Sequence, residues 1–198
     1  MDDLYLVTSL ESAEITKERE FEIYGKIVDI DQLLKCDSFE KHSQWGCPIK
    51  TDDGREGVIR VRAIDDSLYL QTIKVKGGTD GDDECEFEIT RDAFNAIRGL
   101  TDSGLIKTRY KFQMTGDLCY EFDIFTKADG TVSEWVKVDI EIPEDGTIDE
   151  WLERLPDLPV ELTETIVMAP GRKSPANSEF VKNLFTNEFT IPRSSNLV

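Results

Sequence analysis

Charged and large apolar residues alternate along seven segments of the chain, and this alternation predicts β-strands. Side chains of a strand point to opposite faces in turn, so each segment would place its charges on one face and its apolar groups on the other. The segments are residues 18–23, 60–62, 74–76, 84–89, 107–112, 121–124 and 137–142. Short turns such as 115–117 and 128–130 separate neighbouring segments, which indicates antiparallel pairing.

Apolar residues at helical spacing predict helices between these strands. They cover residues 90–100, 147–155 and the region around 180–185, with a fourth expected over 30–39. The expected order is a strand, a helix with a long loop, three strands, a helix, three strands and then helices. We therefore predict an α+β fold: an antiparallel β-barrel, or tunnel, of about seven or eight strands with a charged interior and helices packed on the outside.

Length and composition narrow the class of protein. The 198 residues are enough for one core, so we expect a single domain over 1–198, with a flexible tail from 192 to 198. A net charge of −18 argues against duplex DNA and against an anionic membrane surface as the main partner. Four scattered cysteines favour a cytoplasmic protein with reduced thiols. The single histidine, His42, lies in a polar segment and is expected at the surface. The oligomeric state stays open, with a homodimer as one alternative.

The charged face of the predicted sheet carries two chemically distinct sets of side chains. Guanidinium and ammonium groups hold phosphate oxygens, whereas carboxylates are the hard ligands that Mg²⁺ and Mn²⁺ prefer. The cations expected to converge on one cavity and bind a phosphorylated ligand are Arg60, Arg62, Lys74, Lys76, Lys107, Arg109 and Lys111. The candidate metal ligands are Glu18, Glu20, Glu86, Glu88, Asp123, Asp139 and Glu141. A metal ion between phosphate and carboxylate would polarise the phosphoryl group and orient an attacking water.

An ordinary half-buried sheet with a solvated charged face would show the same alternation. The sorting of charges weakens this alternative, because a solvated face usually mixes both signs in cross-strand pairs. Arg60 and Arg62 would also repel Lys74 and Lys76 on the neighbouring strand, unless an anion or acidic side chains lay between them.

Seven short motifs in order resemble the strands of the CYTH family, the triphosphate tunnel enzymes, which include class IV adenylyl cyclases, thiamine triphosphatases and inorganic triphosphatases. The motifs are residues 18–21, 57–62, 69–74, 86–88, 107–110, 121–125 and 139–142, and the segment 156–163 resembles the family's C-terminal region. The resemblance spans about residues 17–184. It implies a metal-dependent hydrolase, a phosphoric anhydride hydrolase that binds a triphosphate-containing substrate inside a charged β-tunnel.

The resemblance also assigns roles to particular residues. The triphosphate would be held by Arg60, Arg62, Lys74, Lys107 and Arg109. One or two metal ions would be held by Glu86, Glu88 and Glu141, together with Glu18 and Glu20. Asp123 stands where the family places an acidic residue in the tunnel. The candidate catalytic residues are therefore Glu18, Glu20, Lys107 and Arg109.

Three positions depart from the family's pattern. The family's first strand usually carries a lysine where Glu22 stands here, or where Tyr24 stands if Glu20 and Glu22 are the paired glutamates; in either register Lys26 would be the replacement from further along the chain. An arginine is common where this chain has Glu84, and Asp139 replaces the usual glutamate. These changes add negative charge near the expected phosphate site. They keep two other hypotheses open: a non-catalytic protein that binds a nucleotide or other phosphorylated ligand on the same scaffold, and an acidic interaction protein with a vestigial tunnel.

Overall fold

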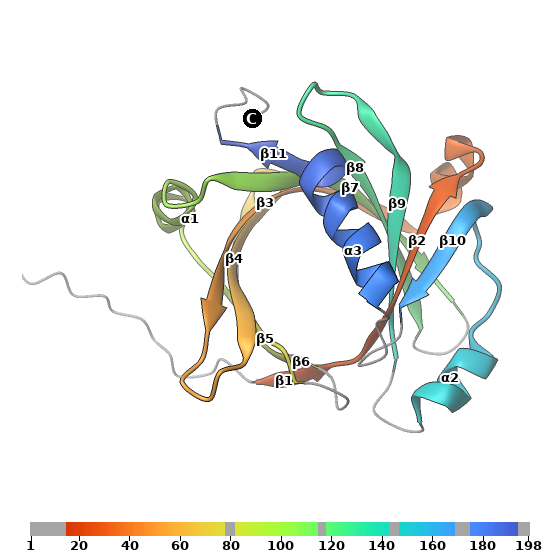
Figure 1. Ribbon diagram of the computed structural model, residues 1–198. Helices are drawn as coiled ribbons and strands as arrows, with labels where there is room; N and C mark the ends of the chain where they lie inside the picture. The colour runs from red at the N-terminus through yellow and green to blue at the C-terminus, as the bar shows by residue number, and fades with distance from the viewer. Residues whose placement is uncertain (1–14, 78–81, 115–117, 143–146, 169–174, 194–198) are drawn as a thin grey trace, which may run out of the picture.

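A computed structural model of the chain describes residues 15–77, 82–114, 118–142, 147–168 and 175–193. Within these ranges, one antiparallel sheet of eleven strands curves around a central cavity (Figure 1). The strands are β1 (Thr16–Glu18), β2 (Glu20–Ile27), β3 (Ser38–Lys50), β4 (Glu56–Ile64), β5 (Leu68–Val75), β6 (Asp82–Glu88), β7 (Ser103–Gln113), β8 (Cys119–Thr126), β9 (Val132–Glu141), β10 (Leu162–Met168) and β11 (Thr190–Pro192). The helical segments are η1 (Ile30–Lys35), α1 (Arg91–Arg98), α2 (Ile148–Arg154), α3 (Pro175–Leu184) and η3 (Phe185–Phe189).

The strands follow one hydrogen-bonded path in the order β1-β6-β5-β4-β3-β7-β8-β9-β2-β10, and β11 pairs with β7. No ladder closes this path within the described residues, so the prediction of a barrel with seven or eight strands is wrong in strand number and in closure. The chain itself joins the two ends of the curve. β1 pairs with β6, whereas β2, which is separated from β1 by a single residue, pairs with β9. The sheet therefore surrounds the cavity as a tunnel-like α+β fold.

Register between neighbouring strands aligns the charged positions on one face. Glu22 of β2 lies opposite Asp139 of β9, and Arg109 of β7 lies opposite Asp123 of β8. A slip of one residue would move the whole apolar set of a strand to the other face, so burial of the apolar face sets this register.

The apolar face of the sheet is buried beneath helices and irregular segments. Its largest cluster includes Phe21, Phe122 and Val138, which Leu33 of η1 and Trp151 of α2 help to cover. A second cluster lies at α1, where Phe94 makes an edge-to-face contact with Trp45. The predicted helices over 90–100 and 147–155 are confirmed as α1 and α2. Each starts after a threonine N-cap whose side chain accepts a backbone N–H, as N-caps characteristically do.

The C-terminal helix packs differently from the other two. Figure 1 shows α3 lying across the curved sheet, and α3 with η3 packs against Tyr24 and Phe125. Phe125 stacks on Phe189 with ring centroids 3.8 Å apart, and both Phe125 and Phe185 line the cavity. The expectation that all helices pack on the outside therefore does not hold for α3. This helix closes part of the cavity-facing side with apolar groups.

Other local expectations have mixed outcomes. The turn at residues 128–130 joins β8 to β9, with Gly130 at a φ of 84° that favours glycine. The expected turn at 115–117 lies outside the described residues. The region expected as a helix over 30–39 contains the short 3-10 helix η1, and β3 begins within the same region at Ser38. The single strand predicted over 18–23 falls on two strands, β1 and β2, and β3, β10 and β11 were not predicted. Pro192 pairs with Ser103 in β11, while residues 194–198 are outside the described ranges.

None of the helices in the described ranges has the length and hydrophobicity needed to traverse a bilayer.

Candidate functional site

The concave face of the sheet lines a cavity of about 430 Å³. Seven lining residues are cations: Arg60, Arg62, Lys74, Lys107, Arg109, Lys111 and Lys137. Nine are carboxylates: Glu20, Glu22, Glu40, Glu84, Glu86, Glu121, Asp123, Asp139 and Glu141. With the single histidine neutral, these residues carry a formal charge of −2. A polyanion that enters the cavity would therefore add to a negative charge, and a bound cation or an added proton would be needed to compensate it.

Three predicted site residues are not placed in this lining. Lys76 is 69% exposed in its side chain and forms an ion pair with Glu56 at 3.0 Å. Glu88 is exposed at the end of β6, and the side chain of Glu18 lies outside the described side chains. Lys76 and Glu88 follow the same alternation as the residues that line the cavity. They lie at the ends of their strands, beyond the part of each strand that lines the cavity.

Asp123 occupies the most buried part of the cavity wall, where two cations of β7 hold it. Arg109 donates from Nε to Oδ1 at 2.7 Å and from Nη2 to Oδ2 at 2.8 Å, and Lys107 donates to Oδ2 as well. Burial alone would raise the pKa of Asp123, but the charges and hydrogen bonds of Lys107 and Arg109 outweigh it and lower that pKa. Burial also lowers the pKa of the Lys107 ammonium, against the attraction of Asp123. Asp123 thus fixes the position of two predicted phosphate ligands.

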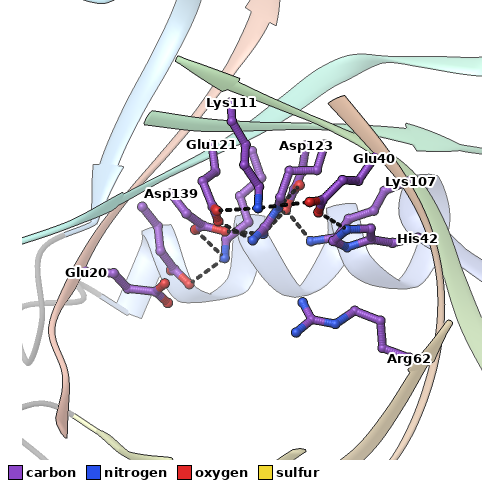
Figure 2. A network of polar contacts seen from close by, with 12 residues as sticks. Glu20, Glu40, His42, Arg62, Lys107, Lys111, Glu121, Asp123 and Asp139 are labelled. Atoms are coloured by element: carbon purple, nitrogen blue, oxygen red, sulfur yellow. Dashed lines mark hydrogen bonds and ion pairs between the residues drawn. The ribbon is translucent and has the colours of Figure 1, made fainter. Parts of the chain in front are cut away.

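The same network continues along the wall to β9 and β3 (Figure 2). Arg109 also contacts Glu121 and donates to Asp139 at 3.2 Å. Lys111 reaches Glu40 at 3.2 Å, and Glu40 in turn accepts a hydrogen bond from Nε2 of His42 at 3.0 Å. Most cations of this wall are therefore already paired with carboxylates of the chain.

His42 corrects a sequence expectation, because it is 1% exposed and lines the cavity. Burial lowers the pKa of His42 to about 4, although the hydrogen bond to Glu40 opposes this shift. The side chain is therefore neutral at pH 7. A signal for its placement was present, since Glu40, His42 and Gln44 alternate in the sequence and all three line the cavity.

Arg60 and Arg62 lie on β4, and Figure 2 shows Arg62 set apart from the β7 network. Arg62 donates to Glu86 at 2.6 Å, and Arg60 lies 3.6 Å from Glu84. These are the acidic neighbours that two adjacent cations require. The Nε atoms of both arginines are nevertheless buried without a hydrogen-bond partner among the described residues. A buried unpaired N–H costs free energy, and both arginines line the cavity, so their guanidinium groups have donors available for an acceptor ligand.

A cluster of three carboxylates lies at another part of the wall. One oxygen from each of Glu20, Glu22 and Asp139 lies within 4.8 Å of the others. Hard oxygen donors at this spacing fit Mg²⁺ or Mn²⁺. The cluster takes Glu20 and Asp139 from the predicted set and adds Glu22. Glu86 and Glu141, also predicted as metal ligands, line the cavity outside this cluster.

Lys137 is a cavity residue that sequence reasoning did not assign. Its Nζ lies 3.2 Å from Glu22 and 2.6 Å from Asp139. Burial would lower the pKa of Lys137, but Asp139 and Glu22 outweigh it and raise that pKa well above its usual range. Lys26, the replacement considered for the missing first-strand lysine, instead pairs with Glu164 at 2.9 Å. The cation that contacts Glu22 therefore comes from β9. The alternation of residues 137–142 already placed Lys137 on the charged face.

A scan against protein-family models finds no match for this chain, and a search of curated proteins finds none either. Solved structures do match. The inorganic triphosphatase NE1496 is 17% identical over 73% of this chain and 84% of its own, with a TM-score of 0.42. HpAC1 from Hippeastrum, a putative adenylyl cyclase with a dominant triphosphatase activity, is 14% identical over 68% of this chain and 85% of its own, with a TM-score of 0.43. PH1819 from Pyrococcus horikoshii OT3 is 17% identical over 82% and 99%, with a TM-score of 0.48.

The likeness to these structures is low, with identities below 20% and TM-scores below 0.5. It assigns no activity or ligand to this chain.

Proposed function

We propose that this chain binds a triphosphate-containing substrate in the cavity and hydrolyses it with the help of a divalent metal ion. The observation that carries the proposal is that the half-buried side chains of Arg60 and Arg62 line the same cavity as a three-carboxylate cluster, and that the buried Nε atom of each has no hydrogen-bond partner among the described residues. Planar guanidinium groups suit phosphate oxygens, and clustered carboxylates suit Mg²⁺ or Mn²⁺. The cavity therefore contains arginines that suit the phosphate groups and carboxylates that suit the metal ion of a metal–phosphate complex.

The residues of this chain would divide the work between binding and positioning. Arg60, Arg62 and Lys74 would hold phosphate oxygens. Lys107 and Arg109, fixed by Asp123, would present their charges to the transferred phosphoryl group without moving, which is how preorganised charge lowers a barrier. No side chain of the chain is proposed as a nucleophile, and water would attack.

Glu20, Glu22 and Asp139 would hold the metal ion. When bound, such an ion polarises a phosphoryl oxygen and favours ionisation of a bound water. The formal charge of −2 on the cavity lining gives a reason for the ion, because two negative charges and a polyanion would otherwise repel one another.

Phosphate release tests this proposal directly. Purified protein would be incubated with tripolyphosphate, nucleoside triphosphates and thiamine triphosphate, each with Mg²⁺ or Mn²⁺. We expect release of phosphate or pyrophosphate from at least one compound, abolished by EDTA and by Asp139→Asn. An absence of turnover across the whole panel, with a correctly folded protein, would refute hydrolysis.

A second candidate, a binding protein without turnover, is favoured by one specific observation. Arg62, Lys107, Arg109 and Lys137 already have carboxylate partners in the cavity. These cations would accept a phosphorylated ligand by exchanging a carboxylate partner for a phosphate oxygen, without a metal ion that activates water. Calorimetry distinguishes the two functions: tight nucleotide binding that EDTA leaves unchanged, with no product, would select the binding protein.

A further inference from the structure

The ammonium group of Lys137 lies among the three carboxylates that we propose as the metal site. It contacts Glu22 at 3.2 Å and Asp139 at 2.6 Å, and the Lys137 side chain is only 14% exposed. The groups facing it are Glu20, Glu22, Asp139 and the buried phenol of Tyr24. Three carboxylates this close would repel one another, so the ammonium balances a charge that would otherwise be costly to bury.

A divalent ion and the Lys137 ammonium compete for the same carboxylates. Both need Glu22 and Asp139 as partners, and two cations a few ångströms apart in a poorly hydrated site repel strongly. Lysine has a flexible four-carbon stem, so its ammonium can leave one anion for another without movement of the backbone. Asp139 is also shared with Arg109, which approaches it at 3.2 Å. A phosphate held by Arg109 would therefore lie near Lys137 and give its ammonium a new partner.

We infer that Lys137 is the resident counter-ion of this cluster, and that a divalent ion binds there with high affinity only when Lys137 transfers to a phosphate group. Metal and polyanion then bind cooperatively, since each removes an obstacle to the other. Such coupling is reciprocal: the polyanion raises metal affinity by the same factor by which the metal raises polyanion affinity. The polyanion half of this inference rests on the proposed function, whereas the competition between Lys137 and the metal does not.

Lysine-to-methionine variants isolate the role of the charge, because methionine keeps an unbranched side chain. Mn²⁺ binding in the absence of phosphate would be measured by calorimetry and by the loss of the free-ion paramagnetic resonance signal. We expect Lys137→Met to bind Mn²⁺ about tenfold or more tightly than the wild-type protein, within the usual span of coupling between sites. Mn²⁺ should also raise the melting temperature of Lys137→Met more than that of the wild type. Lys26→Met, on β2 and paired with Glu164, is the control and should bind Mn²⁺ as the wild type does.

The second measurement adds a non-hydrolysable methylene-bridged tripolyphosphate. It should raise the Mn²⁺ affinity of the wild type about tenfold or more and that of Lys137→Met much less. Lys137→Gln, which keeps a polar side chain, replaces the methionine variant if that variant does not fold.

Equal Mn²⁺ affinity in the wild type and in a folded Lys137 variant, without phosphate, would overturn the inference. That result would leave the phosphate-release test untouched. Conversely, the wild-type protein could hydrolyse no triphosphate while the Lys137 variant binds Mn²⁺ more tightly. That result would refute the proposed function and support Lys137 as the counter-ion.

Discussion

Nη2 of Arg62 lies 2.6 Å from Oε2 of Glu86, and the pair bridges β4 and β6 across the intervening β5. Thr72 of β5 donates to the same carboxylate oxygen at 2.6 Å. The sequence predicted that Arg62 binds phosphate and that Glu86 binds a metal ion. In the folded chain the two side chains form an ion pair with each other. Glu86 therefore limits how strongly Arg62 can attract an incoming anion.

Glu86→Gln separates these two roles of the glutamate. If Glu86 acts as the counter-ion of Arg62, removing its charge should tighten metal-free binding of tripolyphosphate by about 1 kcal/mol, the scale of one solvated charge pair. Calorimetry in EDTA measures this change. Glu88→Gln, two residues along the same strand and exposed, is the matched control and should leave affinity unchanged. Weaker binding by Glu86→Gln would show that the carboxylate helps to hold the ligand.

Arg60→Ala and Arg62→Ala test the phosphate assignment. Each change removes a charge-assisted hydrogen bond and should weaken tripolyphosphate binding by about 1.5–3 kcal/mol. Arg55→Ala is the control, because Arg55 is exposed and pairs with Asp53 and Asp83 outside the cavity lining. Unchanged affinity in both cavity variants would place the ligand elsewhere.

Asp123→Asn tests how much of the fold depends on the buried ion pairs of β7 and β8. Asp123 is fully buried, and its loss would leave Lys107 and Arg109 without their main partner. We expect the free energy of unfolding in urea to fall by about 3–5 kcal/mol. Glu164→Gln breaks the more exposed pair with Lys26 and should lower the free energy of unfolding much less. A loss for Asp123→Asn as small as that of Glu164→Gln would mean that water or a rearranged partner replaces Asp123.

His42 predicts a specific pH dependence of stability. Its folded-state pKa of about 4 lies below the unfolded value of about 6.5, so the unfolded chain takes up the proton first. The stability that neutral His42 contributes is complete above about pH 6.5 and is lost as the pH falls towards 4, by about 3 kcal/mol in total.

Urea unfolding of the wild type and of His42→Gln between pH 7 and pH 4.5 measures this contribution. Glutamine keeps an N–H donor for Glu40 but does not titrate. Acidic groups change stability over the same range in both proteins, so the difference between the two slopes is the diagnostic quantity. The wild type should lose more stability on acidification, and parallel slopes would contradict the buried neutral imidazole.

Local patterns were sufficient for much of this architecture. Period-two alternation placed Arg60, Arg62 and Lys74 on one face of the strands, and those side chains do line the cavity. The same alternation failed for Lys76 and Glu88, because it records which face a residue occupies and not where along the cavity its strand ends. α1 and α2 were also predicted from local signals, since the N-cap and the helical spacing of apolar residues lie within one short segment.

Pairing between distant segments was decided only by the tertiary structure. Lys137 meets Glu22 because β9 pairs with β2, more than a hundred residues earlier in the chain, and nothing in either segment specifies that partner. His42 is buried because β3 joins the sheet between β4 and β7, and α3 covers cavity-facing apolar groups that alternation alone assigned to no partner. The charge of each side chain is written in the sequence, but the charge that opposes it depends on the register and curvature of the whole sheet. That opposing charge determines whether a cation here is available to phosphate or already paired within the chain.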